Sequence, residues 1–112
     1  MKTDGQYTLN MARKFKNDKF LVIEGTEAEF AAIGFGFQIQ FVGRILVCDH
    51  CNEQIAGRKC YYIPVLNGVM CEECFSSWIE TAEHFPEDDH YERVHFDGVR
   101  DKLEKYGLWE NE

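Results

Sequence analysis

Four of the chain's five cysteines fall into two close pairs, and this spacing constrains the fold more than any other feature. Cys48 and Cys51 form the first pair, Cys71 and Cys74 form the second, and nineteen residues separate the pairs. Two residues between cysteines let one turn of backbone direct both sulfurs at a common point, and two such turns complete a tetrahedral ligand set. The sequence therefore predicts that Cys48, Cys51, Cys71 and Cys74 bind one structural Zn²⁺.

Size and composition favour metal binding over disulfide bonds. The chain has 112 residues, the size of one domain, and 45% of them are hydrophobic. A core of this size is small, so a bound metal is expected to contribute much of the folding free energy. The odd number of thiols and the lack of a basic-then-apolar leader at Met1 indicate a reducing cytoplasm. No apolar run is long enough to span a bilayer, so no membrane partner is expected.

The pattern along the chain predicts one domain over residues 1–112, divided into four segments. Residues 1–18 show no clear periodicity and are expected to be partly flexible, and residues 19–47 read as a strand–helix–strand segment. Residues 48–85 are expected to form the zinc-binding core, and residues 86–112 an acidic connector followed by a C-terminal helix.

The strand–helix–strand segment has recognisable punctuation. The apolar run 20–23 predicts a buried strand, and Gly25 is expected to turn the chain. Thr26 and Glu29 have the spacing of a capping box, which predicts a helix that ends near Gly34. The other predictions here are a strand over residues 35–41 with one buried face, a turn at residues 43–44 and a strand over residues 45–47.

In the zinc-binding core, the first cysteine pair is expected to form a tight metal-binding turn, or knuckle, followed by a hairpin closed by Asn67-Gly68. With that turn Pro64 faces Cys71, so Cys60 lies roughly 13 Å from the level of Cys71, and we interpret it as a buried thiol. The second pair then begins a helix that Pro86 ends. One side of this helix is expected to carry Cys74, Trp78, Ala82 and Phe85.

A last helix is predicted within residues 89–106. Asp89 with Glu92 gives a capping signal, and Gly107 gives a stop. Its buried face is expected to include Val99, Leu103 and Tyr106. The four histidines are placed outside the metal site: His50 is expected to point away from it, and His84, His90 and His95 read as surface or rim residues.

The order of knuckle, hairpin and helix in residues 48–85 resembles the treble-clef group of zinc folds. The resemblance implies an α+β fold: a small treble-clef-like zinc domain with an N-terminal strand–helix–strand extension and a C-terminal helix. Four thiolates leave no open position for water or substrate. The hairpin carries no histidine of the kind that treble-clef nucleases use. We therefore expect no enzymatic activity.

Charge predicts the kind of partner. The net charge is −8, and residues 72–112 carry thirteen Asp and Glu against four Lys and Arg. Such a surface repels nucleic acid and attracts basic proteins, although it also serves solubility. We expect a protein partner with a basic surface rather than direct nucleic-acid binding. The candidate partner-binding residues are Glu72, Glu73, Glu80, Glu83, Glu87, Asp88, Asp89 and Glu92.

A short acidic chain with one zinc site and no catalytic set is similar to zinc-containing phage anti-CRISPR proteins, which inhibit the RNA-guided nuclease Cas9. The four paired cysteines and the acidic tract from Glu72 to Glu92 carry this resemblance. It implies a phage or mobile-element inhibitor in the cytoplasm of a bacterial host, which binds Cas9 and blocks its engagement of target DNA. Two alternatives stay open. One is a structural adaptor subunit. The other is a small zinc-dependent nucleic-acid-binding regulator that uses Arg13, Lys14, Phe15, Lys16 and Lys19.

Overall fold

The computed structural model describes residues 11–33, 41–42 and 45–110, and these form an α+β architecture around a five-stranded sheet. The strands lie in the order β6-β5-β2-β1-β7, and only the β1–β7 pair is parallel. The strands are β1 (Ala12–Lys14), β2 (Ile23–Thr26), β5 (Lys59–Ile63), β6 (Gly68–Cys71) and β7 (Trp109–Glu110), with a separate antiparallel pair, β3 (Phe41–Val42) and β4 (Ile45–Leu46). The helices are α1 (Glu27–Ala32), α2 (Glu72–Thr81), the 3₁₀ helix η1 (Pro86–Asp88) and α3 (Asp89–Lys105).

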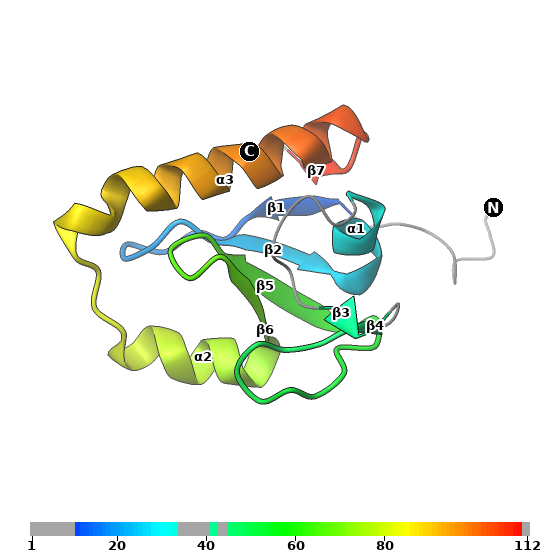
Figure 1. Cartoon of the computed structure of the whole chain (residues 1–112), viewed down its shortest axis with the longest axis horizontal. Helices are drawn as coiled ribbons and strands as arrows, with labels where there is room; N and C mark the ends of the chain where they lie inside the picture. The colour runs from blue at the N-terminus through cyan, green and yellow to red at the C-terminus, as the bar shows by residue number, and fades with distance from the viewer. Residues whose placement is uncertain (1–10, 34–40, 43–44, 111–112) are drawn as a thin grey trace.

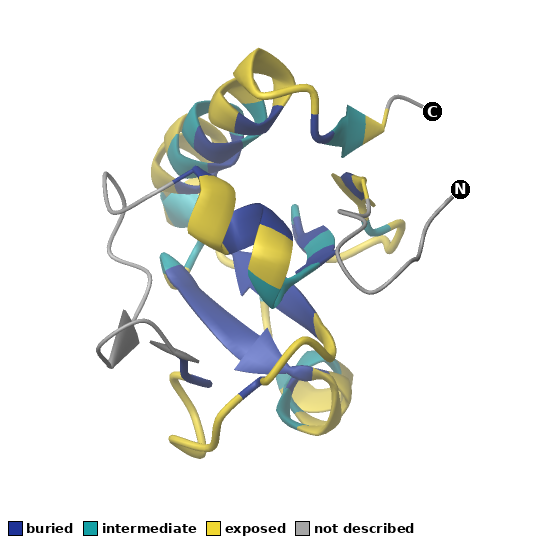
Figure 2. Ribbon diagram, turned by 90° about the vertical axis from the view of Figure 1, so that its right-hand side faces the viewer, coloured by how far each residue is buried: buried dark blue, intermediate teal, exposed yellow. Residues whose placement is uncertain are grey.

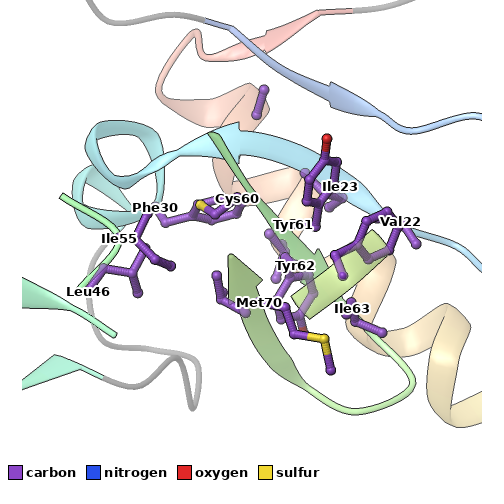
Figure 3. Close-up of a cluster of buried hydrophobic side chains, with 14 of the residues drawn as sticks. Val22, Ile23, Phe30, Leu46, Ile55, Cys60, Tyr61, Tyr62, Ile63 and Met70 are labelled. Atoms are coloured by element: carbon purple, nitrogen blue, oxygen red, sulfur yellow. The ribbon is translucent and has the colours of Figure 1, made fainter. Parts of the chain in front are cut away.

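Helices cover both faces of the sheet. Helix α2 lies along β5 and β6, and α3 runs beside β1 and β7 (Figure 1). Figure 2, turned by 90°, shows α2 and α3 on opposite sides of the sheet. Successive side chains of β5 pack on the two opposite faces of the sheet. Tyr61 stacks on Phe75 of α2 at 4.2 Å between ring centroids, and Tyr62 faces Phe30 of α1. Strand β5 is therefore buried on both faces from Cys60 to Ile63 (Figure 3).

The start of β2 corrects the predicted strand. The predicted run 20–23 is buried or half-buried, but the strand begins only at Ile23. The reason is local: the backbone N–H of Phe20 donates to Asn17 and that of Leu21 to Glu92, so neither pairs with a strand. Strands β1 and β7 were not predicted at all, and residues 1–10 lie outside the described part of the chain.

Gly25 does not turn the chain. It lies inside β2 and pairs with Cys60 of β5. A Cβ at this position would lie 3.2 Å from Phe30 Cε2 and 3.4 Å from the Ala12 Cβ, so the glycine lets α1 pack directly on the sheet. The capping box is confirmed, with the Thr26 N–H donating to Glu29 Oε1 at 2.7 Å.

The segment after α1 is described only in part. Residues 34–40 and 43–44, which contain the predicted helix stop, most of the predicted strand over 35–41 and the predicted turn, lie outside the described residues. Strand β4 agrees with the predicted strand over 45–47, since Val47 adds an isolated bridge to Gln54.

The β5–β6 hairpin has a different loop from the predicted one. Ile63 pairs with Gly68, so the loop spans four residues instead of the two of an Asn67-Gly68 turn. Asn67 takes a positive φ of 53°, and the Tyr62 hydroxyl donates to its Oδ1 at 2.7 Å. The longer loop moves the register by four residues and places Cys60 directly opposite Cys71, which corrects the roughly 13 Å predicted offset.

Helix α2 ends earlier than predicted. It stops at Thr81 because Ala82 is extended, and Phe85 lies beyond the helix and is exposed. Its most buried residue is Phe75, which the predicted face omitted. The Lys19 side chain supplies the missing C-terminal cap: its Nζ donates to the carbonyls of Ile79 and Ala82 at 2.8 and 3.1 Å.

Helix α3 agrees with the predicted range and is continuous through Gly98. Its C-terminus forms a Schellman motif: Gly107, at φ 72°, donates to Glu104, and Leu108 donates to Leu103. The predicted buried face holds for Val99 and Leu103 but is wrong for Tyr106, which is exposed. The acidic connector predicted to begin at residue 86 forms η1, and α3 follows it directly at Asp89.

Candidate metal centre

The four paired cysteines come together at one end of the sheet. The ligand atoms of Cys48, Cys51, Cys71 and Cys74 all lie within 4.8 Å of one another. Cys51 Sγ is 3.9 Å from Cys71 Sγ. Four sulfurs around one zinc at about 2.3 Å are separated by roughly 3.8 Å, so this cluster has the dimensions of a tetrahedral thiolate site. A metal ion can be held here, and zinc is consistent with the donor set.

The first pair is positioned by a tight turn after β4. The Asn52 N–H donates to the Cys48 carbonyl at 2.9 Å, and Asn52 takes a φ of 66°. Inside the turn, the His50 N–H points at Cys48 Sγ at 3.4 Å. His50 itself is exposed and outside the sulfur cluster, as predicted.

Asp49 fixes this turn to the edge of the sheet. Its N–H donates to the Val69 carbonyl at 2.8 Å, and its Oδ2 accepts from the Val69 N–H at 3.1 Å. Gly68 makes this approach possible, because a Cβ there would collide with the Asp49 carboxylate. The knuckle therefore covers the edge that β6 would otherwise expose.

The second pair spans the end of β6 and the first turn of α2. Cys71 ends the strand and is the N-cap residue of the helix, so Cys74 follows three residues later on the same side. Backbone N–H groups at the start of a helix stabilise negative charge. The predicted helix start at the second pair is confirmed.

Backbone hydrogen bonds set the electrostatics of the cluster. Burial acts to raise the pKa of Cys48, but hydrogen bonds from the N–H groups of Cys51, Cys71 and His50 outweigh it and lower that pKa to about 7. Burial raises the pKa of both Cys71 and Cys74. Hydrogen bonds from Cys74 oppose this rise at Cys71, whereas the neighbouring sulfurs add to it at Cys74. One thiolate is thus favoured without an ion, and a divalent cation would supply the positive charge that stabilises four.

The fifth cysteine lies beside the cluster without joining it. Cys60 is fully buried next to Phe30 (Figure 3) and is absent from the four-sulfur group. Burial raises the pKa of its thiol above the ordinary range, so it stays protonated. The prediction of a buried, non-ligating thiol agrees with the structure, although the distance argument behind it was wrong.

Seven of the eight predicted partner-binding acids are exposed or half-buried, and one is buried. Glu72, Glu73 and Glu80 line an open groove of about 680 Å³ along α2, together with Arg58 and Lys59. The other acids follow the helix: Glu83, Glu87 and Asp89 are exposed and Asp88 is half-buried. Glu92 is buried, so its predicted place on an exposed acidic surface is wrong.

The predicted basic stripe is broken up by ion pairs and packing. Arg13 lies 3.1 Å from both Glu24 and Glu110, and Lys19 caps α2. Phe15 packs edge-on against the rings of Tyr61 and Phe75.

One group of residues with metal-binding chemistry escaped the sequence analysis. His84 is only half-exposed and lies beside Asp89 and Glu92. Glu92 serves no capping box: its Oε2 accepts from the Leu21 N–H, and its Oε1 faces His84 Nε2. The sequence signal was available, since Asp89 and Glu92 share a helix face, but it was interpreted as a cap. His90 is exposed, as predicted, and His95 is half-exposed.

Comparisons with protein-family models, with curated proteins and with solved structures gave no match to this chain. The treble-clef and anti-CRISPR resemblances therefore gain no support from a relative. In the part of the chain that the structure describes, no helix is long and apolar enough to cross a membrane.

Proposed function

We propose that the chain is a non-enzymatic, zinc-stabilised protein-binding module whose zinc site is of the treble-clef type. The observation that carries the proposal is the convergence of four sulfurs from two separate segments within 4.8 Å. Four thiolates saturate a tetrahedral ion, so the zinc has a structural role. It would tie the knuckle to β6 and to the start of α2, in addition to the two Asp49–Val69 hydrogen bonds and the packing of Phe75.

Metal analysis of matched variants tests this role. Purified protein should contain zinc that Cys71→Ser loses together with cooperative folding, whereas Cys60→Ser should keep its zinc because Cys60 lies outside the cluster. Equal zinc content in the two variants, or a well-folded Cys71→Ser protein without metal, would contradict the proposal.

The partner surface we propose is the exposed side of α2 and the residues that follow it. The groove is lined by Glu72, Glu73 and Glu80 of α2 and by two cations, Lys59 and Arg58, the latter 3.8 Å from Glu73. Carboxylates outnumber cations, and Ser76 and Ser77 add hydroxyls to the lining. A basic, extended segment of a partner protein fits this combination of charge and hydrogen-bonding groups.

Charge reversal tests this surface. The double variant Glu80→Lys and Glu83→Lys should slow capture of a basic partner from a host lysate, and the wild-type rate should fall with salt. The matched control is Glu53→Lys with Glu104→Lys, which changes the net charge equally on other elements. An equal effect of the two variants would show that only net charge matters.

A narrower form of the proposal is that the partner is a host nucleic-acid enzyme such as Cas9, and that the chain blocks its engagement of target DNA. Such enzymes carry basic nucleic-acid channels that an acidic surface can occupy. Stoichiometric loss of target-DNA binding on adding the protein, relieved by the Glu80→Lys and Glu83→Lys variant, is the expected result. Unchanged DNA binding at excess protein would remove this form and leave the broader one.

Nucleic-acid binding is the second candidate, and one observation favours it. Lys14, Arg93 and Arg100 line an open groove of about 320 Å³ with the rings of Phe96 and Trp109. Cations beside aromatic rings suit a single strand, although Asp97 lies 3.3 Å from Arg100 and Glu104 and Glu110 share the groove. Binding of a labelled oligonucleotide at low salt would support this candidate, and its absence would exclude it.

A further inference from the structure

A second cluster of metal-ligating side chains lies at the junction of α2, η1 and α3. His84 Nε2 is 2.8 Å from Glu92 Oε1 and 3.4 Å from Asp89 Oδ1, and the three ligand atoms fall within 4.8 Å of one another. The cluster shares no residue with the four-cysteine centre. Its donors are one imidazole nitrogen and two carboxylate oxygens, a hard set that differs from four thiolates.

The local fold builds this cluster from two short pieces of chain. Asp89 and Glu92 are three residues apart in the first turn of α3, so both project from one side of the helix. Pro86 begins η1, and the Asp88 N–H donates to the Phe85 carbonyl at 3.0 Å, which turns the chain back after α2. His84, just before this turn, therefore faces the start of α3.

The surroundings hold the ligands in place. Glu92 is only 5% exposed, and the Leu21 N–H holds its second oxygen at 2.8 Å while the first faces His84. The His84 ring packs edge-on against Phe20 at 5.2 Å. A carboxylate held by its own hydrogen bond, as in Glu92, and a ring fixed by packing, as in His84, are features that metal sites use to orient their ligands.

We propose that His84, Asp89 and Glu92 form a second site, which binds a divalent first-row transition metal such as Zn²⁺. Ligand atoms about 2.1 Å from one ion lie roughly 3.0–3.4 Å apart in octahedral or tetrahedral arrangements, close to the separations here. Three protein ligands leave at least one position for water. The ion would link the α2–α3 connection to the segment before β2. This proposal is independent of the four-cysteine centre.

The alternative is a plain ion pair, in which protonated His84 bridges the two carboxylates. The hydrogen bond to Glu92 raises the pKa of His84, against the opposing effect of burial, and Asp89 and Asp88 add to the rise. A proton and a metal ion would then compete for the same Nε2 atom. Binding should therefore be measured near pH 8, where the lower proton concentration favours the metal ion.

The test is calorimetric titration of the full chain, first given one equivalent of zinc and then titrated with Zn²⁺ or Co²⁺. A further 1:1 event is expected, and the cobalt that binds in this event should lack thiolate-to-metal charge-transfer absorption. His84→Gln, Asp89→Asn and Glu92→Gln should each weaken this event by at least about 10-fold. His90→Gln, at an exposed histidine on the same helix, is the matched control and should leave it unchanged.

Two of these variants keep the test interpretable. Asp89 is exposed, and glutamine at position 92 retains an oxygen that accepts from the Leu21 N–H, so both proteins should fold. No second event in the wild type up to millimolar zinc overturns the proposal, and the cluster is then an ion pair only. Wild-type binding in any of the three ligand variants also overturns the three-residue site.

Discussion

Helices α2 and α3 cover opposite faces of the sheet, but different interactions hold their ends. The start of α2 lies in the sulfur cluster, and its last carbonyls accept hydrogen bonds from Lys19, sixty or more residues earlier in the chain. The end of α3 depends on two residues just beyond its C-cap residue Tyr106, namely Gly107 and Leu108. The C-terminus of α2 is therefore capped by a residue distant in sequence, whereas the C-terminus of α3 is capped by residues next to it in the chain. This difference predicts that α2 unfolds before α3 when the protein is destabilised.

Removal of metal should separate the two helices most clearly. Chelation of the zinc that we propose for the four-cysteine centre is expected to lower the free energy of unfolding by several kcal/mol, because metal binding and folding are coupled at structural thiolate sites. Amide exchange should increase first at residues 48–51 and 71–81, and later in α3. Equal acceleration in both helices would break the comparison and show that the ion holds the whole sheet.

Gly68→Ala should destabilise the contact between the knuckle and β6 without changing a cysteine. The new Cβ would displace the Asp49 carboxylate and remove its hydrogen bond from the Val69 N–H. We expect a loss of about 1–3 kcal/mol of stability and weaker zinc retention in a competition assay with a chromophoric chelator. In the background of Asp49→Ala, Gly68→Ala should cost little more, because the clash is already gone. Additive losses would exclude this mechanism.

Gly107→Ala tests the self-contained end of α3. At φ 72° a side chain is strained, and nothing crowds the position, so the expected cost is about 1–2 kcal/mol of pure backbone strain, measured by urea unfolding. Gly57→Ala, at φ 80° and equally uncrowded, makes the same change between the knuckle and β5. We expect the Gly57→Ala cost to shrink after chelation and the Gly107→Ala cost to persist. The reverse order would contradict the division between the two halves.

Lys19→Met should give the smallest effect, about 0.5–1 kcal/mol, because the site is exposed and the cap can be replaced by water. Exchange of the amides in the last turn of α2 should rise while α3 is unchanged. Lys14→Met, on an exposed position of β1, is the matched control and should leave α2 unaffected. A Lys19→Met protein with unchanged exchange in α2 would show that the long-range cap is unnecessary.

The same difference explains how much the sequence could predict. Local signals were sufficient for the Thr26–Glu29 capping box and for the end of α3 near Gly107. The two cysteine pairs also predicted the four-sulfur cluster, because their spacing is typical of a zinc site although nineteen residues separate them. The end of α2 could not be predicted, since the sequence near Thr81 gives no sign that the side chain of Lys19 caps the helix. The short edge strand β7 has no pattern of its own and exists because the Schellman turn directs Leu108 and Trp109 back to β1.

The hairpin and the Glu92 contacts failed for a related reason. Asn67-Gly68 is a favourable two-residue turn, but the tertiary pairing of β5 with β2 and β6 selected a longer loop and a shifted register. Asp89 and Glu92 have the spacing of a cap, but the Glu92 carboxylate accepts from the Leu21 N–H and faces His84 Nε2 instead. In both cases a local rule gave way to partners distant in sequence.

Residues 19–21 carry a consequence for how this chain tolerates change. Lys19 caps the end of α2, Phe20 packs between Trp78 and His84, and Leu21 donates to the first turn of α3. These three consecutive residues thus connect both helices to the segment that leads into β2. Inserting a single amino acid here would displace at least one of these residues from its partner. An insertion in this short stretch should therefore destabilise the protein more than an insertion in the surface loops around it.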